Sequence, residues 1–513
     1  MQKVDLPASW VWTTVADLGR VFSGGTPSTK EPSYWGSDIA WISPSDLTGY
    51  ASKFIARGAK SISSKGLKNS SAVVMPAGSV HFSSRAPIGY VAIAANEVST
   101  NQGFKSLTPA VGVFNEYIYY YFKSAKQLAE SLATGTTFKE ISGAAFSRMP
   151  VPLAPEREQQ RIVAKLEELF SELDKGVENL RTAQQQLKVY RQALLKHAFE
   201  GKLTAEWRAQ NPDKLESAEA LLARIQQERE ARYQQQLAEW QEAQQAWEAS
   251  GKTDSKPAKP KAPKVLPALT AEELAELPEL PEGWTWLKVH QLCEVVRGGS
   301  PRPAGDPKFY GGNIPFLKVA DLTKDSLPYL TSYTYTIKEA GLNKTRQIAP
   351  NTLLLSNSGA TLGVPKICLI SATMNDGVAA FLGLPQDQLL YHYYFWKSQT
   401  DRLRNIDQGA AQPNLNTDLI KETPIPMCSP AERAILTQKI EAVLSGSDHI
   451  EQVIATSLQQ AEALRQSILK KAFSGQLVPQ HPDDEPASVL LERIRAERAA
   501  QPKARGRKSR AAA

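Results

Sequence analysis

The chain contains few residues whose types and spacing could support catalysis. Its six histidines and three cysteines form no metal-ligand spacing, so we expect no zinc or hydrolytic centre. We therefore assign Cys293, Cys368 and Cys428 as reduced core thiols. Gly251-Lys252-Thr253 has the ending of a phosphate-binding loop, but Ala246 stands where that loop requires an earlier glycine, and no strand precedes it.

The carboxylates do not form a nuclease centre either. Pro212-Asp213 and Pro482-Asp483-Asp484 are not followed by the acidic-x-Lys element that would help to hold magnesium, so helix-start capping explains them better. The sequence also lacks a strand followed by G-x-G-x-x-G, and it lacks the Asn-Pro-Pro-aromatic or Asp-Pro-Pro-aromatic stretch that grips a flipped base in amino-methyltransferases. We predict that the chain is not an enzyme by itself.

What remains is polar surface suited to binding. The 513 residues include 60 Lys and Arg against 53 Asp and Glu, and this excess of seven positive charges weakly favours a polyanionic partner. Residues 1–150 carry 14 basic and 9 acidic side chains, and residues 284–427 carry 14 and 11. Loops rich in Ser, Thr, Asn and Gln in these regions could combine phosphate contacts with hydrogen bonds to base edges in the major groove.

The elements that position these loops occur twice in the chain. A shift of 274 residues aligns most features of one half with the other, over a unit of about 200 residues. A repeat this long predicts two similar domains related by an approximate two-fold axis, although duplication without functional symmetry stays open. The matching pairs include Trp10 and Trp284, Gly24-Gly25 and Gly298-Gly299, Gly103 and Gly377, and Ala198-Phe199 and Ala472-Phe473.

Each unit begins with a globule and ends with a long helix. Short apolar runs between Gly- and Pro-rich turns predict strands with a few short helices, so the expected class is α+β. Apolar residues then recur at steps of three and four from Ile162 to Leu194, through Tyr190, and from Ile440 to Ile468, through Ile450 and Leu464. A helix of this length extends about 67 Å and cannot be buried by its own globule.

The economical arrangement is two tandem, similar globular domains separated by the two long helices, packed on each other as an antiparallel coiled coil. The alternative is that each helix binds a different protein. Six segments follow from this reading: 1–152, first globule; 153–203, first long helix; 204–280, a helical Gln- and Glu-rich segment and a Lys/Pro linker; 281–428, second globule; 429–475, second long helix; and 476–513, a short helix and basic tail.

Two features bear on where the chain acts. No stretch approaches the ~18 consecutive apolar residues of a membrane span, and the start lacks the apolar core of a secretory signal, so we expect a cytoplasmic protein without membrane association. Residues 498–510 carry six basic side chains and no acidic one, which indicates either a disordered tail or a nonspecific phosphate-binding arm.

This combination of motifs and order resembles the specificity subunit of type I restriction-modification systems. The resemblance spans nearly the whole chain, in both copies, and the duplicated plan of globule and long helix is itself characteristic of that family. The residues that carry it are Ser23-Gly24-Gly25-Thr26-Pro27-Ser28, Tyr34-Trp35-Gly36-x5-Ile42, Ser84-x4-Gly89, Thr100-Asn101-Gln102-Gly103, Gly135-Thr136-Thr137-x-Lys139 and Pro150-x-Pro152-x-x-Pro155, followed by the first long helix.

The resemblance implies a DNA-reading scaffold without catalysis of its own. Each globule would be a target recognition domain for one half of an asymmetric, bipartite site in double-stranded DNA, and the helices would set the spacer between the halves. Two modification subunits would bind S-adenosylmethionine and methylate adenine, and restriction subunits would use ATP and magnesium to translocate and cut. The alternatives are a stand-alone regulator that binds a split operator, and a fused DNA methyltransferase with unrecognised motifs.

The two globules differ at polar positions where their framework residues repeat. The shift of 274 places Arg85 on Gly359, Thr136-Thr137 on Ala410-Ala411, and Phe138-Lys139-Glu140 on Gln412-Pro413-Asn414, as expected if the globules read different sequences. Arg85 could contact guanine bidentately, and Asn or Gln could contact adenine, whereas any single candidate could instead cap a turn, as we favour for Asn101 and Asn375. The DNA-contact candidates are Thr26, Ser28, Lys30, Ser84, Arg85, Asn101, Gln102, Thr136, Thr137 and Lys139 in the first globule, and Arg302, Lys308, Asn357, Ser358, Asn375, Gln412, Asn414 and Asn416 in the second.

Overall fold

The computed structural model forms two compact units, and each contains one globule. It describes residues 5–85, 87–135, 139–251, 256–260, 262, 267–359, 361–405 and 415–500. The first unit combines Met1–Thr182 with Ile454–Ala513, and the second is Ala183–Val453. Each unit therefore takes the start of one long helix and the end of the other.

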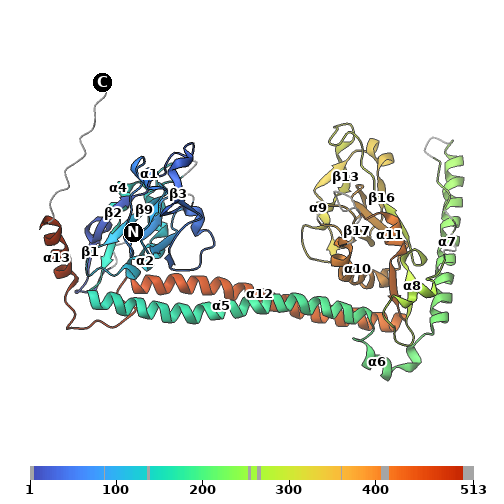
Figure 1. Cartoon of the computed structure of the whole chain (residues 1–513). Helices are drawn as coiled ribbons and strands as arrows, with labels where there is room; N and C mark the ends of the chain where they lie inside the picture. The colour runs from blue at the N-terminus through green and yellow to red at the C-terminus, as the bar shows by residue number, and fades with distance from the viewer. Residues whose placement is uncertain are drawn as a thin grey trace. The chain divides into compact units, whose positions relative to one another are not determined.

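The first globule is built on two sheets and a strand pair (Figure 1). Its central strands have no solvent-exposed face, because every residue of β6 (Val80–Ser83) and β7 (Val91–Ala94) is buried. The five-stranded sheet has the order β2 (Gly19–Ser23), β9 (Phe104–Pro109), β6, β7 and β4 (Phe54–Ile55); the three-stranded sheet has the order β5 (Lys60–Ile62), β3 (Trp35–Ile42) and β8 (Ser99–Thr100); and β1 (Val11–Thr14) pairs with β10 (Pro150–Leu153).

Helices cover this sheet and close the core. The rings of Phe82 on β6, Phe122 on α2 and Phe146 on α4 lie 5.3–5.5 Å apart, and all three side chains are fully buried. The helices are α1 (Ser64–Lys68), α2 (Asn115–Ser124), α3 (Lys126–Leu132) and α4 (Gly143–Ser147).

The second globule repeats this topology, with four strands instead of three in its smaller sheet. The predicted α+β class with two similar globular domains is therefore confirmed. The five-stranded sheet runs β12 (Glu294–Arg297), β20 (Val378–Leu382), β17 (Thr352–Ser356), β18 (Pro365–Cys368) and β14 (Tyr329–Leu330); the other runs β15 (Tyr335–Ile337), β13 (Tyr310–Leu317), β19 (Ala372–Met374) and β16 (Arg346–Ile348); β11 (Thr285–Lys288) pairs with β21 (Pro424–Met427); and the helices are α9 (Val319–Leu322), α10 (Leu389–Arg404) and α11 (Thr417–Glu422).

Strand pairing corrects the sequence alignment at one loop. Val80 of β6 pairs with Leu107, and Leu353 of β17 pairs with Phe381. Leu107 and Phe381 are 274 residues apart, but Val80 and Leu353 are 273 apart, so the second copy has one extra residue after this strand. The structural equivalent of Arg85 is consequently Ser358 and not Gly359, and that of Ser84 is Asn357.

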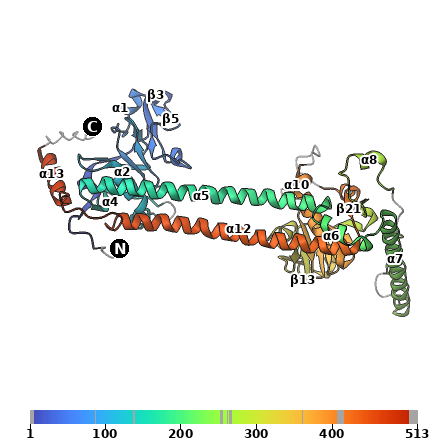
Figure 2. The same ribbon diagram turned by 90° about the horizontal axis from the view of Figure 1, so that it is seen from below.

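The two long helices, α5 (Glu156–Phe199) and α12 (Pro430–Ala472), run side by side and antiparallel (Figures 1 and 2). In the first unit Arg465 forms an ion pair with Asp174. In the second unit Arg191 contacts Asp448 at 2.6 Å and Glu451 at 2.7 Å. The N-terminal part of α5 therefore contacts the C-terminal part of α12 in the first unit. In the second unit the C-terminal part of α5 contacts the N-terminal part of α12.

The contact face of these helices differs from the predicted apolar stripe at three positions. Tyr190, Ile450 and Leu464 are 52%, 51% and 51% exposed. Arg191 and Arg465, the neighbours of Tyr190 and Leu464, are turned toward the opposite helix instead and pair with its carboxylates. The prediction was wrong there because an apolar residue and its polar neighbour both fit the three-four spacing, and only the partner helix selects between them.

The segment that follows each long helix packs on the globule of the same unit. In the second unit α6 (Ala205–Gln210) and α7 (Ala218–Ala249) follow α5, and Leu221 and Ile225 of α7 join the core with Trp284. In the first unit α13 (Ala487–Ala500) follows α12, and its leucines join the core with Trp10. The short α8 (Ala271–Ala275) precedes the second globule. Within the described residues, no helix is long and apolar enough to cross a membrane.

Candidate nucleic-acid interface

Three loops of the first globule meet where β2 and β6 end and β9 begins. The Gly25 N–H donates to the Thr100 carbonyl at 2.8 Å, and the Ser84 N–H donates to the Gly103 carbonyl at 2.7 Å. A Cβ at Gly24 would lie 1.7 Å from the Asn101 carbonyl oxygen, so only glycine allows this approach. These contacts place residues 24–28, 84–85 and 101–103 side by side at the ends of three neighbouring strands of the five-stranded sheet.

Some candidates of the first globule hold these loops together. Ser84 is fully buried and its hydroxyl donates to the Gly103 carbonyl at 3.0 Å. The Asn101 side-chain oxygen accepts from the Gly103 N–H at 2.8 Å, which is a turn contact. The Thr26 hydroxyl donates to the side-chain oxygen of Gln102. The direct structural roles of Ser84 and Asn101 leave little of either side chain for DNA.

The remaining candidates of the first globule face solvent. Ser28, Lys30, Gln102 and Lys139 are exposed, and Arg85 is 39% exposed. Thr136 and Thr137 lie outside the described residues.

Arg85 belongs to a group of three charged side chains. One of its guanidinium nitrogens lies 3.6 Å from a carboxylate oxygen of Glu140, whose other oxygen lies 3.6 Å from the ammonium nitrogen of Lys105. The Lys105 side chain is only 8% exposed. Arg85 was among the predicted contact residues, whereas Lys105 and Glu140 were not. The available signal for Lys105 was the difference between the two copies, since its counterpart under the shift of 274 is Ala379.

The equivalent loops of the second globule meet in the same way. The Gly299 N–H donates to the Met374 carbonyl at 3.1 Å, the Asn357 N–H donates to the Gly377 carbonyl at 2.9 Å, and the Leu415 N–H donates to the Asn357 carbonyl at 2.8 Å. Asn357 is fully buried. Neither polar atom of its side chain has a hydrogen-bond partner among the described residues.

Other candidates of the second globule divide into turn residues and exposed cations. The Asn375 side-chain oxygen accepts from the Gly377 N–H at 3.2 Å, and that of Asn416 caps α11 by accepting from the Leu419 N–H at 2.8 Å. Arg302 and Lys308 are exposed and Ser358 is half-buried. Gln412 and Asn414 lie outside the described residues.

Asp376 organises the polar loops of the second globule. Its carboxylate accepts from the Ser300 hydroxyl at 2.6 Å and from the Arg302 guanidinium at 3.4 Å, and its backbone carbonyl accepts from Arg297 at 2.6 Å. The hydrogen bond from Ser300, assisted by the positive charges of Arg302 and Arg297, lowers the pKa of Asp376 below its usual value. Asp376 is the counterpart of Gln102 under the shift of 274 and was not among the predicted contact residues.

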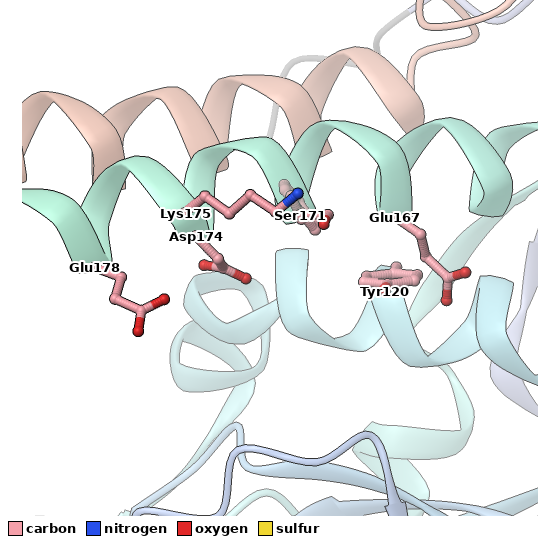
Figure 3. Close-up of a pocket in the computed structure, with 7 residues that line it drawn as sticks. Tyr120, Glu167, Ser171, Asp174, Lys175 and Glu178 are labelled. Atoms are coloured by element: carbon pink, nitrogen blue, oxygen red, sulfur yellow. The ribbon is translucent and has the colours of Figure 1, made fainter.

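A groove of about 420 Å³ between α2 and α5 is a different kind of surface (Figure 3). Figure 3 shows Tyr120 beside Glu167, with Asp174 and Glu178 further along α5. Lys175 provides the one positive charge of its lining. Carboxylates repel phosphates, so this groove is unsuited to nucleic acid.

In the part of the chain that the structure describes, no group of three or more His, Cys, Asp or Glu residues could hold a metal ion. The three cysteines are buried and unpaired, and burial raises the pKa of the Cys293 thiol to about 12.

Comparisons with known proteins give one consistent result. Residues 7–180 and 281–463 match the family described as type I restriction modification DNA specificity domain. The MjaIX specificity subunit of Methanocaldococcus jannaschii is 39% identical over 196 residues, 38% of this chain and 44% of that protein, so this match spans less than half of its length. The EcoDI specificity subunit of Escherichia coli is 25% identical over 400 residues, 75% of this chain and 77% of that protein.

Two solved structures share the fold. One, from a study of complex assembly and conformational transition of the type I restriction-modification system, has a TM-score of 0.62 at 17% identity and covers 92% of this chain and 99% of its own. The other, the HsdS subunit from Thermoanaerobacter tengcongensis, has a TM-score of 0.50 at 17% identity and covers 93% and 99%.

Proposed function

The chain belongs to the type I restriction modification DNA specificity domain family, and we propose that it selects the DNA sequence on which a type I restriction-modification complex acts. The observation that supports this proposal is a cluster of polar loops that lies at the same place in both globules but has different side chains in each. Gly25 and Gly299 approach equivalent backbone carbonyls, whereas Arg85 and Arg302 come from different loops. One framework would thus read two different half-sites.

We assign sequence reading to the exposed cations and amides of these loops. Arg85 and Gln102 in the first globule and Arg302 in the second have side chains that can reach base edges in a major groove. Lys30, Lys139 and Lys308 are exposed and suited to phosphate contacts, which position a protein without reading sequence. Ser84, Asn101, Asn357, Asn375 and Asn416 would support the loops.

The long helices would set the distance between half-sites. α5 is one uninterrupted helix of 44 residues, which corresponds to about 66 Å. Half-sites on one face of a duplex lie ~34 Å apart for each helical turn, so helices of this length suffice. The division of the chain into six segments, with target recognition domains at 1–152 and 281–428 and spacer helices at 153–203 and 429–475, belongs to this proposal.

Catalysis would come from partner subunits. The names of the related specificity subunits and of the solved assembly support a role within a larger complex. In our proposal two modification subunits bring S-adenosylmethionine and methylate adenine, and restriction subunits bring ATP and magnesium. The site of action is the cytoplasm, where such a complex meets double-stranded DNA.

The test is a map of N6-methyladenine in a host that carries the modification subunit, with and without this chain. We expect one split motif with two unlike halves that is methylated only when the chain is present. Methylation of DNA by the purified chain with S-adenosylmethionine alone would instead establish a fused methyltransferase. Binding to a split operator without any modification subunit would establish a stand-alone regulator.

A further inference from the structure

Glu140 is held beside Arg85 by the backbone as well as by charge. The Glu140 N–H donates to the Thr134 carbonyl at 2.9 Å, the Thr134 N–H donates to the Glu140 carbonyl at 3.0 Å, and the next residue, Ile141, donates to the Ser84 carbonyl at 3.0 Å. Arg85 and Glu140 also form an antiparallel bridge. The position of the Glu140 carboxylate is therefore set by segments on both sides of it.

Lys105 fixes the other side of this carboxylate. Its ammonium nitrogen lies 3.6 Å from Glu140 and 3.4 Å from the Gln102 carbonyl, which accepts a hydrogen bond from it. A lysine that is 8% exposed needs such partners, because an unpaired buried charge is costly. Glu140 thus lies between a buried cation, Lys105, and a partly exposed cation, Arg85.

Among the described residues, Arg85 pairs only with Glu140. Its guanidinium contacts Glu140 through one nitrogen, and the side chain is 39% exposed beside the loop of Gln102. An arginine held on one edge by a carboxylate loses little rotamer entropy when its other edge forms two hydrogen bonds to guanine.

The second globule shows that the fold does not require this triad. Ala379 occupies the position of Lys105 on the equivalent strand, where it pairs with Leu355 as Lys105 pairs with Phe82. Ser358 occupies the position of Arg85. Because the same sheet forms without a lysine at the position of Lys105 and without this arginine, we attribute the three charges to a role specific to the first globule.

We propose that Glu140 and Lys105 are positioning residues that hold Arg85 for recognition of one guanine in the half-site read by the first globule. This inference rests on the proposed function and names two specificity determinants for it. Lys105 acts through Glu140, and Glu140 acts through Arg85.

The test compares variants of the full chain, assembled with its modification subunits, on a library of sites that differ from the natural motif at one base pair. The readout is the methylation of each variant site relative to the natural site. Arg85→Ala should lose about tenfold to hundredfold of the discrimination at one base pair of one half-site. Glu140→Gln and Lys105→Met should lose about twofold to fivefold at the same base pair, with no change in the other half-site.

Two controls separate positioning from a general effect of charge or stability. Glu130→Gln removes a carboxylate of the same globule that faces only Lys126, at 4.0 Å, among the described ion pairs, and it should leave discrimination unchanged. The double variant Arg85→Ala, Glu140→Gln should match Arg85→Ala alone, because Glu140 has nothing left to position. The cooperative unfolding transition of each variant, followed by circular dichroism, shows whether it folds.

The outcomes distinguish this inference from the proposed function. If Arg85→Ala relaxes one position and Glu140→Gln and Lys105→Met do not, the positioning role is wrong and the proposed function stands. If Glu140→Gln still acts in the Arg85→Ala background, Glu140 contacts DNA itself and the positioning role is again wrong. If the natural chain directs no split motif, both proposals fail.

Discussion

The two globules present an arginine and a carboxylate from different loops of one fold. In the first, Arg85 follows β6 and pairs with Glu140, which lies before α4. In the second, Arg302 follows β12 and pairs with Asp376, which lies between β19 and β20. The sheet determines where the loops meet, and the exposed side chains of each loop differ between the globules.

A second difference concerns the hydrogen bond made by the loop that follows β2 in the first globule and β12 in the second. Thr26 and Gln102 form a neutral hydrogen bond in the first globule. At the equivalent positions Ser300 and Asp376 form a charged one, and Arg297 and Arg302 add positive charge to the same loops. The two globules therefore share a strand framework but differ in the charges of their loops. A protein that recognises two different half-sites requires such a difference.

The largest expected effect tests whether the units are independently stable. Phe122 and Trp396 are equivalent and fully buried, so Phe122→Ala or Trp396→Ala should lower the free energy of unfolding of its own unit by about 3–5 kcal/mol. Hydrogen exchange measured residue by residue would show the loss confined to one unit. Equal loss of protection in both units from either variant would mean that the two globules do not fold separately.

The next effect tests whether each arginine reads its own half-site. Replacing Arg302 by alanine should reduce discrimination by about 1–3 kcal/mol at one base pair of the half-site that Arg85 does not affect. Methylation of single-base variants of the motif measures this. Relaxation of the same half-site by Arg85→Ala and Arg302→Ala would contradict the assignment of one globule to each half.

Acid should destabilise both units, because each contains a buried histidine, although the two histidines lie on different elements. Burial lowers the pKa of His81 to about 4 and of His392 to about 3, well below the value near 6.5 of an unfolded histidine. Between those values the unfolded chain binds protons that the folded chain does not, so stability falls as the pH falls from 6.5, by about 1.4 kcal/mol per pH unit for each histidine.

This pH effect can be measured by urea unfolding at pH 6 and pH 5. His81→Asn should reduce the pH dependence of the first unit and leave that of the second unchanged. A pH dependence of the first unit that His81→Asn does not alter would show that other groups cause it.

The smallest effect compares the two equivalent arginines between the long helices. Arg191→Ala and Arg465→Ala should each cost less than about 1 kcal/mol, because these ion pairs are partly exposed. High salt should remove the effect of Arg191→Ala, which loses only ion pairs. Arg465 also lies over the Phe170 ring at 4.7 Å, so part of its effect should persist in salt. Equal salt sensitivity of the two variants would contradict this contact.

The sequence by itself determined the features that depend on local pattern. Repeated glycines and aromatic residues at one shift revealed the duplication, and short apolar runs and three-four spacing gave the α+β globules and the long helices, because periodicity and turn residues act over a few neighbours. The same pattern could not say whether Tyr190 or Arg191 faces the partner helix.

Only the tertiary structure decided which side chains meet. Lys105 and Glu140 are 35 residues apart, and strand pairing rather than sequence spacing brings both to Arg85. The one-residue shift that makes Ser358 the counterpart of Arg85 likewise follows from hydrogen-bond register between β17 and β20. Local periodicity specifies elements, but long-range pairing specifies contacts, since a loop can gain a residue without changing the apolar pattern on either side of it.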